Sequence, residues 1–108
     1  MLAWFNTKEV DAFADSVVAE LRARFPPSGL EVQTKKDVQR VLKGVDRLLA
    51  RVEEFARRER LNVYKKARFG NRIQWALREA QYPAEFAEAM TQELVTHLTL
   101  AARKAGAG

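Results

Sequence analysis

Basic and aromatic side chains alternate between Arg57 and Trp75, and no other part of the 108-residue chain has so unusual a composition. Glu59 is the single acidic residue of that segment. Basic side chains contact phosphates, and aromatic rings stack on unpaired nucleobases. This mixture therefore indicates a surface for single-stranded nucleic acid or RNA. The side chains concerned are Arg57, Arg58, Arg60, Tyr64, Lys65, Lys66, Arg68, Phe69, Arg72 and Trp75.

The two outermost aromatic residues of this segment also have a purely structural interpretation. Tyr64 and Trp75 can pack against a second helix while the neighbouring bases keep their charged ends in water. We expect this packing role for both rings. The segment contains no recognised RNA-binding signature, and the chain has no helix-turn-helix, zinc-finger or basic-zipper pattern.

A second basic surface is expected on residues 36–58. If this stretch is helical, its bases fall within about 80° of one another, because each residue turns the chain by about 100°. Apolar residues from Val38 to Ala56 then occupy the opposite face. We expect changes at Arg40, Arg47 and Arg51 to spare the fold, because none lies on the apolar face. The basic stripe consists of Lys36, Arg40, Lys43, Arg47, Arg51 and Arg58.

Catalytic chemistry has little support in the sequence. The chain has no cysteine and one histidine, His97, which lies on the apolar face of its predicted helix. Glu53 and Glu54 are adjacent, so on a helix they point about 100° apart and cannot share a substrate. Glycine-rich phosphate loops and nucleophile elbows are absent. We therefore predict a protein that is not an enzyme and has no cofactor and no metal site.

Charge is distributed unevenly along the chain. The net charge is +5, but residues 35–78 hold fourteen bases against five acids, and the rest of the chain is acidic. This asymmetry favours a polyanionic partner. The longest apolar run, Met1–Phe5, is far short of the roughly 20 residues of a bilayer span. We predict a cytoplasmic protein, monomeric or homodimeric, without a membrane partner.

The hydrophobic periodicity predicts one all-α domain over residues 1–108, built as a bundle of four amphipathic helices. Their expected ranges are 7–25, 35–60, 63–81 and 83–104, and residues 26–33 form the linker between the first two. Asn6, Thr34 and Asn62 are suitable N-terminal caps, and Pro83 suits the first turn of the last helix. The helix over 35–60 is the longest, so we expect it to be the spine of the bundle.

The sequence thus predicts a small basic binding module. Our first hypothesis is that it binds a polyanion, with nucleic acid as the first candidate, through the 36–58 stripe and residues 57–75. The alternative is a protein-interaction or oligomerisation module that binds an acidic protein or a second copy of itself. Steep salt dependence of oligonucleotide binding would separate the first hypothesis from the second.

Overall fold

The computed structural model describes residues 6–28 and 36–106, of which 83% are helical and none lie in a strand. The predicted all-α bundle is therefore confirmed, and the described residues measure 44 × 25 × 19 Å. Within these ranges the helices are α2 (Lys8–Arg24), α3 (Lys36–Lys43), α4 (Asp46–Arg58), α5 (Val63–Glu79) and α6 (Ala84–Gly106).

Helix α2 follows its predicted pattern closely. The cap residue of α2 is Thr7, one position after the predicted cap Asn6, and the Thr7 side chain makes no capping hydrogen bond. The Asn6 side-chain oxygen accepts a hydrogen bond from the Lys8 backbone N–H at 3.1 Å, which satisfies a donor at the start of the helix. The helix ends at Arg24, two residues before Pro26, as expected for a residue that cannot continue a helix. Its buried side chains are Val10, Ala14, Val17, Val18 and Leu21.

The predicted helix over 35–60 is instead two helices, and this corrects the expected spine. Gly44 and Val45 interrupt it, with the Gly44 N–H bonded to the Val41 carbonyl at 2.9 Å. The Phe25 ring lies so close that a Cβ on Gly44 would stand 2.7 Å from it. Val45 stays buried through the turn, so the apolar pattern runs on and hides the break. The proposed cap Thr34 lies outside the described residues.

Helices α5 and α6 begin close to their predicted starts. The Asn62 side chain accepts a hydrogen bond from the Lys65 N–H at 2.7 Å, so the predicted cap of α5 is confirmed. Residues 59–62 form the predicted turn between α4 and α5. Helix α6 starts at Ala84, one residue after Pro83, and it runs to Gly106.

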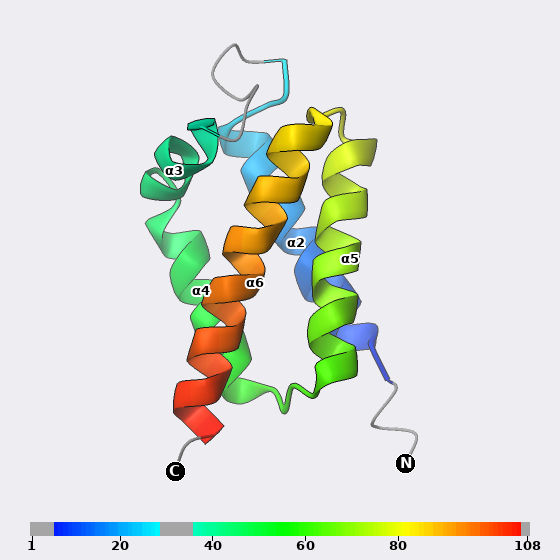
Figure 1. Ribbon diagram of the computed structural model, residues 1–108, viewed down its shortest axis with the longest axis vertical. Helices are drawn as coiled ribbons and strands as arrows, with labels where there is room; N and C mark the ends of the chain where they lie inside the picture. The colour runs from blue at the N-terminus through cyan, green and yellow to red at the C-terminus, as the bar shows by residue number, and fades with distance from the viewer. Residues whose placement is uncertain (1–5, 29–35, 107–108) are drawn as a thin grey trace.

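The helices form a four-sided bundle in which α2 and α5 run in one direction and α4 and α6 run in the other (Figure 1). Helix α5 packs on α2 and on α6, and α6 packs on α4. Side chains close the remaining side, because the rings of Phe13 and Phe55 stack with centroids 4.2 Å apart. Helix α3 packs over α6 and α4 at one end of the bundle (Figure 1).

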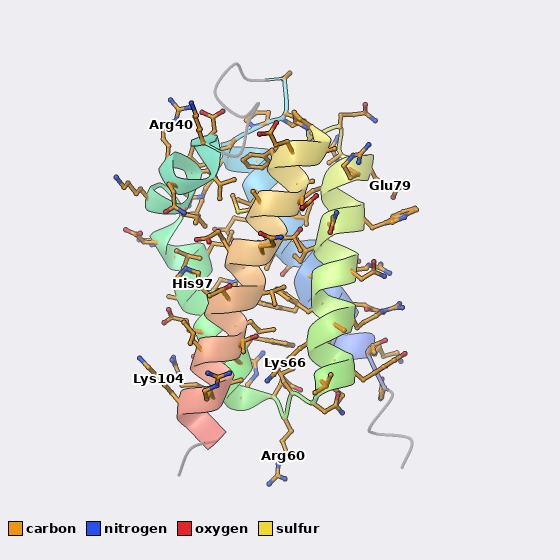
Figure 2. All side chains as sticks on the ribbon, in the orientation of Figure 1. Arg40, Arg60, Lys66, Glu79, His97 and Lys104 are labelled. Carbon is orange, nitrogen blue, oxygen red and sulfur yellow. The ribbon has the colours of Figure 1, made fainter. Side chains whose placement is uncertain are left out.

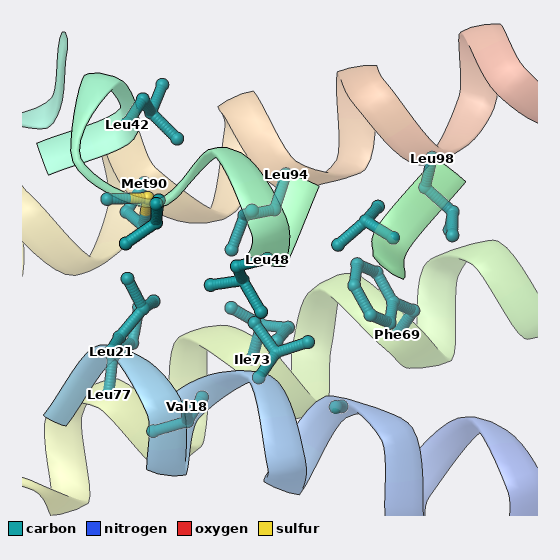
Figure 3. Close-up of a cluster of buried hydrophobic side chains, with 14 of the residues drawn as sticks. Val18, Leu21, Leu42, Leu48, Phe69, Ile73, Leu77, Met90, Leu94 and Leu98 are labelled. Carbon is teal, nitrogen blue, oxygen red and sulfur yellow. The ribbon is translucent and has the colours of Figure 1, made fainter. Parts of the chain in front are cut away.

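The core runs along the centre of the bundle, with contributions from each of the described helices (Figure 3). Leu48, which belongs to the predicted apolar face between Val38 and Ala56, is fully buried. Gly70 lets α5 and α6 approach closely, because a Cβ there would lie 3.0 Å from a methyl group of Val95. The largest fully buried side chains include Leu21, Leu48, Phe69, Ile73, Leu77, Phe86, Met90, Leu94 and Leu98.

Tyr82 joins the α5–α6 turn to the end of α2, a role that the sequence does not reveal. Its hydroxyl donates a hydrogen bond to the Phe25 carbonyl at 2.6 Å, and its ring stacks on Phe86. Burial raises the pKa of Tyr82 to about 12, because the charged phenolate would be poorly solvated there. Phe25 is therefore held from two sides. Its ring packs where a side chain at Gly44 would lie, and its carbonyl is bonded to Tyr82.

We predict that Leu48→Ala lowers the free energy of unfolding by about 2–5 kcal/mol, because it leaves a cavity in the centre of the core. Urea denaturation followed by circular dichroism measures this loss. Arg47→Ala is the matched control, since Arg47 is exposed and precedes Leu48 on the same helix. Equal stability of the two variants would contradict the position assigned to Leu48.

Candidate polyanion-binding surface

Two arginines of α5 are committed to contacts with α2. Arg68 donates two hydrogen bonds to the Asp11 carboxylate, at 2.8 and 3.0 Å. One turn along both helices, Arg72 donates two hydrogen bonds to Asp15, at 2.9 and 2.8 Å. Such two-point pairs fix the plane of the guanidinium group. The positive charges of Arg68 and Arg72, both predicted to meet a polyanion, are therefore largely compensated within the protein.

One of these pairs also lowers the pKa of a carboxyl group on α2. Hydrogen bonds from Arg68 hold the pKa of the Asp11 carboxyl below its ordinary value, and partial burial opposes this effect. The Thr7 hydroxyl adds a hydrogen bond to the same carboxylate at 3.3 Å. Asp11 is consequently ionised in the folded protein down to lower pH than an ordinary aspartate.

Arg51, another member of the predicted basic stripe, also reaches α2. Its guanidinium donates hydrogen bonds to the Glu20 carboxylate and, at 3.1 Å, to the Ser16 hydroxyl. It also lies 5.8 Å from the centre of the Phe13 ring. Arg51 thus contacts α2, which its position on the basic stripe did not indicate, and Arg51→Glu would place two carboxylates together between α4 and α2. That such a change spares the fold stays a prediction.

The basic stripe is divided by the break at Gly44. Lys36, Arg40 and Lys43 lie on α3, and the other three bases lie on α4. All six are exposed. Arg40 hydrogen-bonds to Asp37 on its own helix, and Arg58 pairs with Glu59 at 3.6 Å. For Lys43 and Arg47, the described part of the chain provides no carboxylate at ion-pair distance.

The structure brings bases from three separate segments together at the end of the bundle opposite α3. Arg60, Lys66 and Lys104 all lie at this end, and Arg60 points away from the bundle (Figure 2). We call this group the basic end. It comprises Arg57 and Arg58 from α4, Arg60 from the turn, Lys65 and Lys66 from α5, and Arg103 and Lys104 from α6.

Sequence reasoning missed the contribution of α6 to the basic end. Arg103 and Lys104 have an ordinary role as cations in the last turn of a helix, where they offset the partial negative charge of unpaired carbonyls. Only the bundle shows that the last turn of α6 lies beside the last turn of α4. Glu59 and Glu9 are acids close to this group, and both line a shallow hollow beside Lys65.

The aromatic residues of the 57–75 segment separate into two kinds. Phe69 is fully buried in the core, whereas Tyr64 is 43% exposed and Trp75 is 62% exposed. The prediction that Trp75 packs against a second helix is wrong. Trp75 lies on the same side of α5 as Tyr64 and Arg68, at the margin of the contact with α2, where Arg68 and Arg72 reach across to α2 and leave the indole exposed.

His97 lies at the boundary of the core, as predicted, and faces α4. Its Nδ1 is 3.9 Å from a Glu53 carboxylate oxygen, and both line a groove of about 320 Å³ with Arg57, Leu100 and Lys104. The residues that line this groove include no serine, threonine or cysteine. Over the same ranges, no three acidic or histidine side chains are grouped in a way that could hold a metal ion.

Comparison of the chain with protein-family models, with curated proteins and with solved structures found no match. None of the helices in residues 6–28 and 36–106 combines the length and the apolar character that crossing a membrane requires. The surface chemistry of the bundle is thus the basis for assigning a function.

We predict that acid weakens the fold partly through Asp11. Its pKa is lowered on folding, so its contribution to stability is complete above the ordinary pKa of 3.8. This contribution is lost as the pH falls through the lower folded-state value. Thermal melts between about pH 6 and about pH 2 should show that Asp11→Asn lowers Tm near neutral pH and reduces the further loss in acid.

Glu88→Gln is the control for this experiment, because Glu88 is exposed and pairs with no base in the part of the chain that the structure describes. The control should retain the pH dependence of the unchanged protein. An Asp11→Asn variant that loses as much stability in acid as the control would assign the acid sensitivity to other carboxylates.

Proposed function

We propose that this protein binds a polyanion, best matched by single-stranded nucleic acid, at the basic end, and that the outer face of α3 and α4 extends the contact. The observation that carries the proposal is the convergence of seven bases from α4, the following turn, α5 and α6 at one end of the bundle. Protein contacts with nucleic acid derive most of their affinity from cations placed against phosphates.

The bases that support this proposal are those left without internal partners. Arg51, Arg68 and Arg72 are paired with acids of α2, so we remove them from the phosphate-binding set. Arg58 pairs with Glu59, and within the described ranges no carboxylate lies at ion-pair distance from the other candidates at the basic end. These are Arg57, Arg60, Lys65, Lys66, Arg103 and Lys104.

The outer face of α4 leads directly to the basic end. Arg47 and Arg57 are ten residues apart on the same helix, which corresponds to about 15 Å at 1.5 Å per residue. Phosphates in one strand of a duplex are spaced by about 3.4 Å along its axis, so a strand of a few nucleotides spans this distance. Lys43 and Arg47 can thus meet the same strand that the basic end holds.

An acidic protein partner is the alternative, because exposed bases attract carboxylates as well as phosphates. The proposed activity is binding without catalysis, in line with the absence of cysteine, of a glycine-rich phosphate loop and of a nucleophile elbow from the sequence. A cytoplasmic location and a monomeric or homodimeric state remain predictions. Oligonucleotide binding and its salt dependence distinguish the two partners.

We predict that Arg60→Glu with Lys66→Glu strongly weakens binding to a single-stranded oligonucleotide of mixed sequence. The logarithm of the binding constant should fall steeply with the logarithm of salt concentration for the unchanged protein. For this variant the slope should be smaller by about 0.7 for each lost contact with a single strand. Fluorescence anisotropy of a labelled oligonucleotide measures both quantities.

Two variants with the same change in net charge serve as comparisons. Lys43→Glu with Arg47→Glu tests the α3–α4 face and should weaken binding less. Arg22→Glu with Arg78→Glu places the change in the last turns of α2 and α5, remote from the basic end, and should leave the salt slope unchanged. Equal losses in all three variants would contradict a defined site. No binding by the unchanged protein at low salt would refute the proposal and favour the acidic protein partner.

A further inference from the structure

Helix α5 presents a row of flat side chains along the margin of its contact with α2. Tyr64, Arg68, Arg72 and Trp75 follow one another at steps of four, four and three residues, so they lie along one side of the helix. Tyr64 and Trp75 are eleven residues apart, or about 16 Å along the axis. Two exposed aromatic rings thus mark the ends of the row, and two guanidinium groups lie between them.

The guanidinium groups in this row are held in place. Each uses its Nε and one terminal nitrogen for the two hydrogen bonds to Asp11 or Asp15. Its second terminal nitrogen is not used in these bonds, and a guanidinium plane stacks readily on aromatic groups. A ligand that contacts the row therefore does not have to order two long side chains, which lowers the entropic cost of binding.

A hollow of about 200 Å³ lies at the Trp75 end of the row. Its lining consists of Arg68, Asn71, Arg72 and Trp75. This volume is below the range of about 300–1,000 Å³ that is typical of pockets for drug-sized ligands. It suits one planar unit of a polymer, next to an indole ring for stacking and an amide that can donate and accept hydrogen bonds.

The charges around the row differ between its two ends, and this difference determines which end attracts phosphates. Asp11 and Asp15 compensate Arg68 and Arg72, and Glu79 lies one turn beyond Trp75 at the end opposite the basic end (Figure 2). In the other direction, Lys65 belongs to the basic end and lies ten residues before Trp75, or about 15 Å away. Phosphates are therefore attracted to the basic end, and the uncharged part of the ligand meets the row.

We propose that this row is a stacking platform, on which a base of single-stranded nucleic acid stacks against Trp75 while the phosphates of the same strand lie on the basic end. This inference rests on the proposed function and adds the site of base contact. The Asn71 amide faces the edge of the base in the hollow. A partner without planar rings cannot stack on the Trp75 indole.

The intrinsic fluorescence of Trp75 tests the proposal. The chain contains two tryptophans, Trp4 and Trp75, so a Trp4→Phe background leaves Trp75 as the reporter. The probes are a single-stranded oligonucleotide of about eight nucleotides, in deoxyribose and ribose forms, and an abasic strand of the same length. We expect either base-containing strand to quench Trp75, and the abasic strand to bind without quenching it.

The affinity of a Trp75→Ala variant provides the second measurement. Loss of one stacked base should weaken binding of the base-containing strand by about 5- to 100-fold, with no change in the salt slope, because no charge is removed. Trp75→Phe should recover part of the loss. Val63→Ala is the matched control, since Val63 is an 80% exposed apolar residue of the same helix. The melting curves of the Trp75 and Val63 variants should match that of the unchanged protein.

Three results would overturn the platform. Salt-dependent binding without quenching, and with full affinity in Trp75→Ala, would remove the platform and leave the proposed function intact. An equal loss of affinity for the abasic strand in Trp75→Ala would show that the indole does not act through a base. Failure of every strand to bind at low salt would overturn both proposals together.

Discussion

The four long helices α2, α4, α5 and α6 each have one apolar face, and these faces can be removed from water only if they meet along a single axis. Leu48 and Ile73 lie on that axis, and both are fully buried. This requirement also determines where α3 lies. Helix α3 must turn at Gly44 to lie over α6 and α4, and the turn is possible because Gly44 carries no side chain where the Phe25 ring packs. Tyr82 fixes the same corner through the Phe25 carbonyl.

Packing of the core also determines which charged side chains form ion pairs within the protein. Once α2 and α5 lie side by side in the same direction, acids four residues apart on α2 face bases four residues apart on α5. Glu20 meets Arg51 across the other side of α2. Exposed ion pairs of this kind contribute little to stability, because water and salt screen them. Their larger effect is on the surface, where they withdraw three arginines from the set available to a partner.

The surface that remains has two parts with different chemistry. The basic end combines bases from α4, α5 and α6 and provides charge, and the outer face of α5 provides planar groups with nearly balanced charge. Long-range attraction to phosphates and short-range stacking on bases are the two contributions expected of a protein that holds single strands without reading a sequence. Their separation on this bundle allows each to be removed without the other.

Hydrophobic periodicity was enough to predict the class of fold, the burial of Leu48 and the inner faces of α5 and α6, because these depend on local spacing along a helix. The cap at Asn62 was predictable for the same reason, since it acts within three residues of its own position. Periodicity could not show the break at Gly44, because Val45 keeps the apolar pattern intact across it.

The candidate surface was predicted only in part. The sequence identified Arg57, Lys66 and Trp75 as unusual, but it could not tell which bases would find acids or whether the indole would be covered. Those outcomes depend on how α2, α5 and α6 lie against one another, which involves residues more than fifty positions apart, such as Asp11 and Arg68. The tertiary structure alone paired those residues and exposed Trp75, because ion pairing and burial depend on distance in space and helical periodicity reports only distance along the chain.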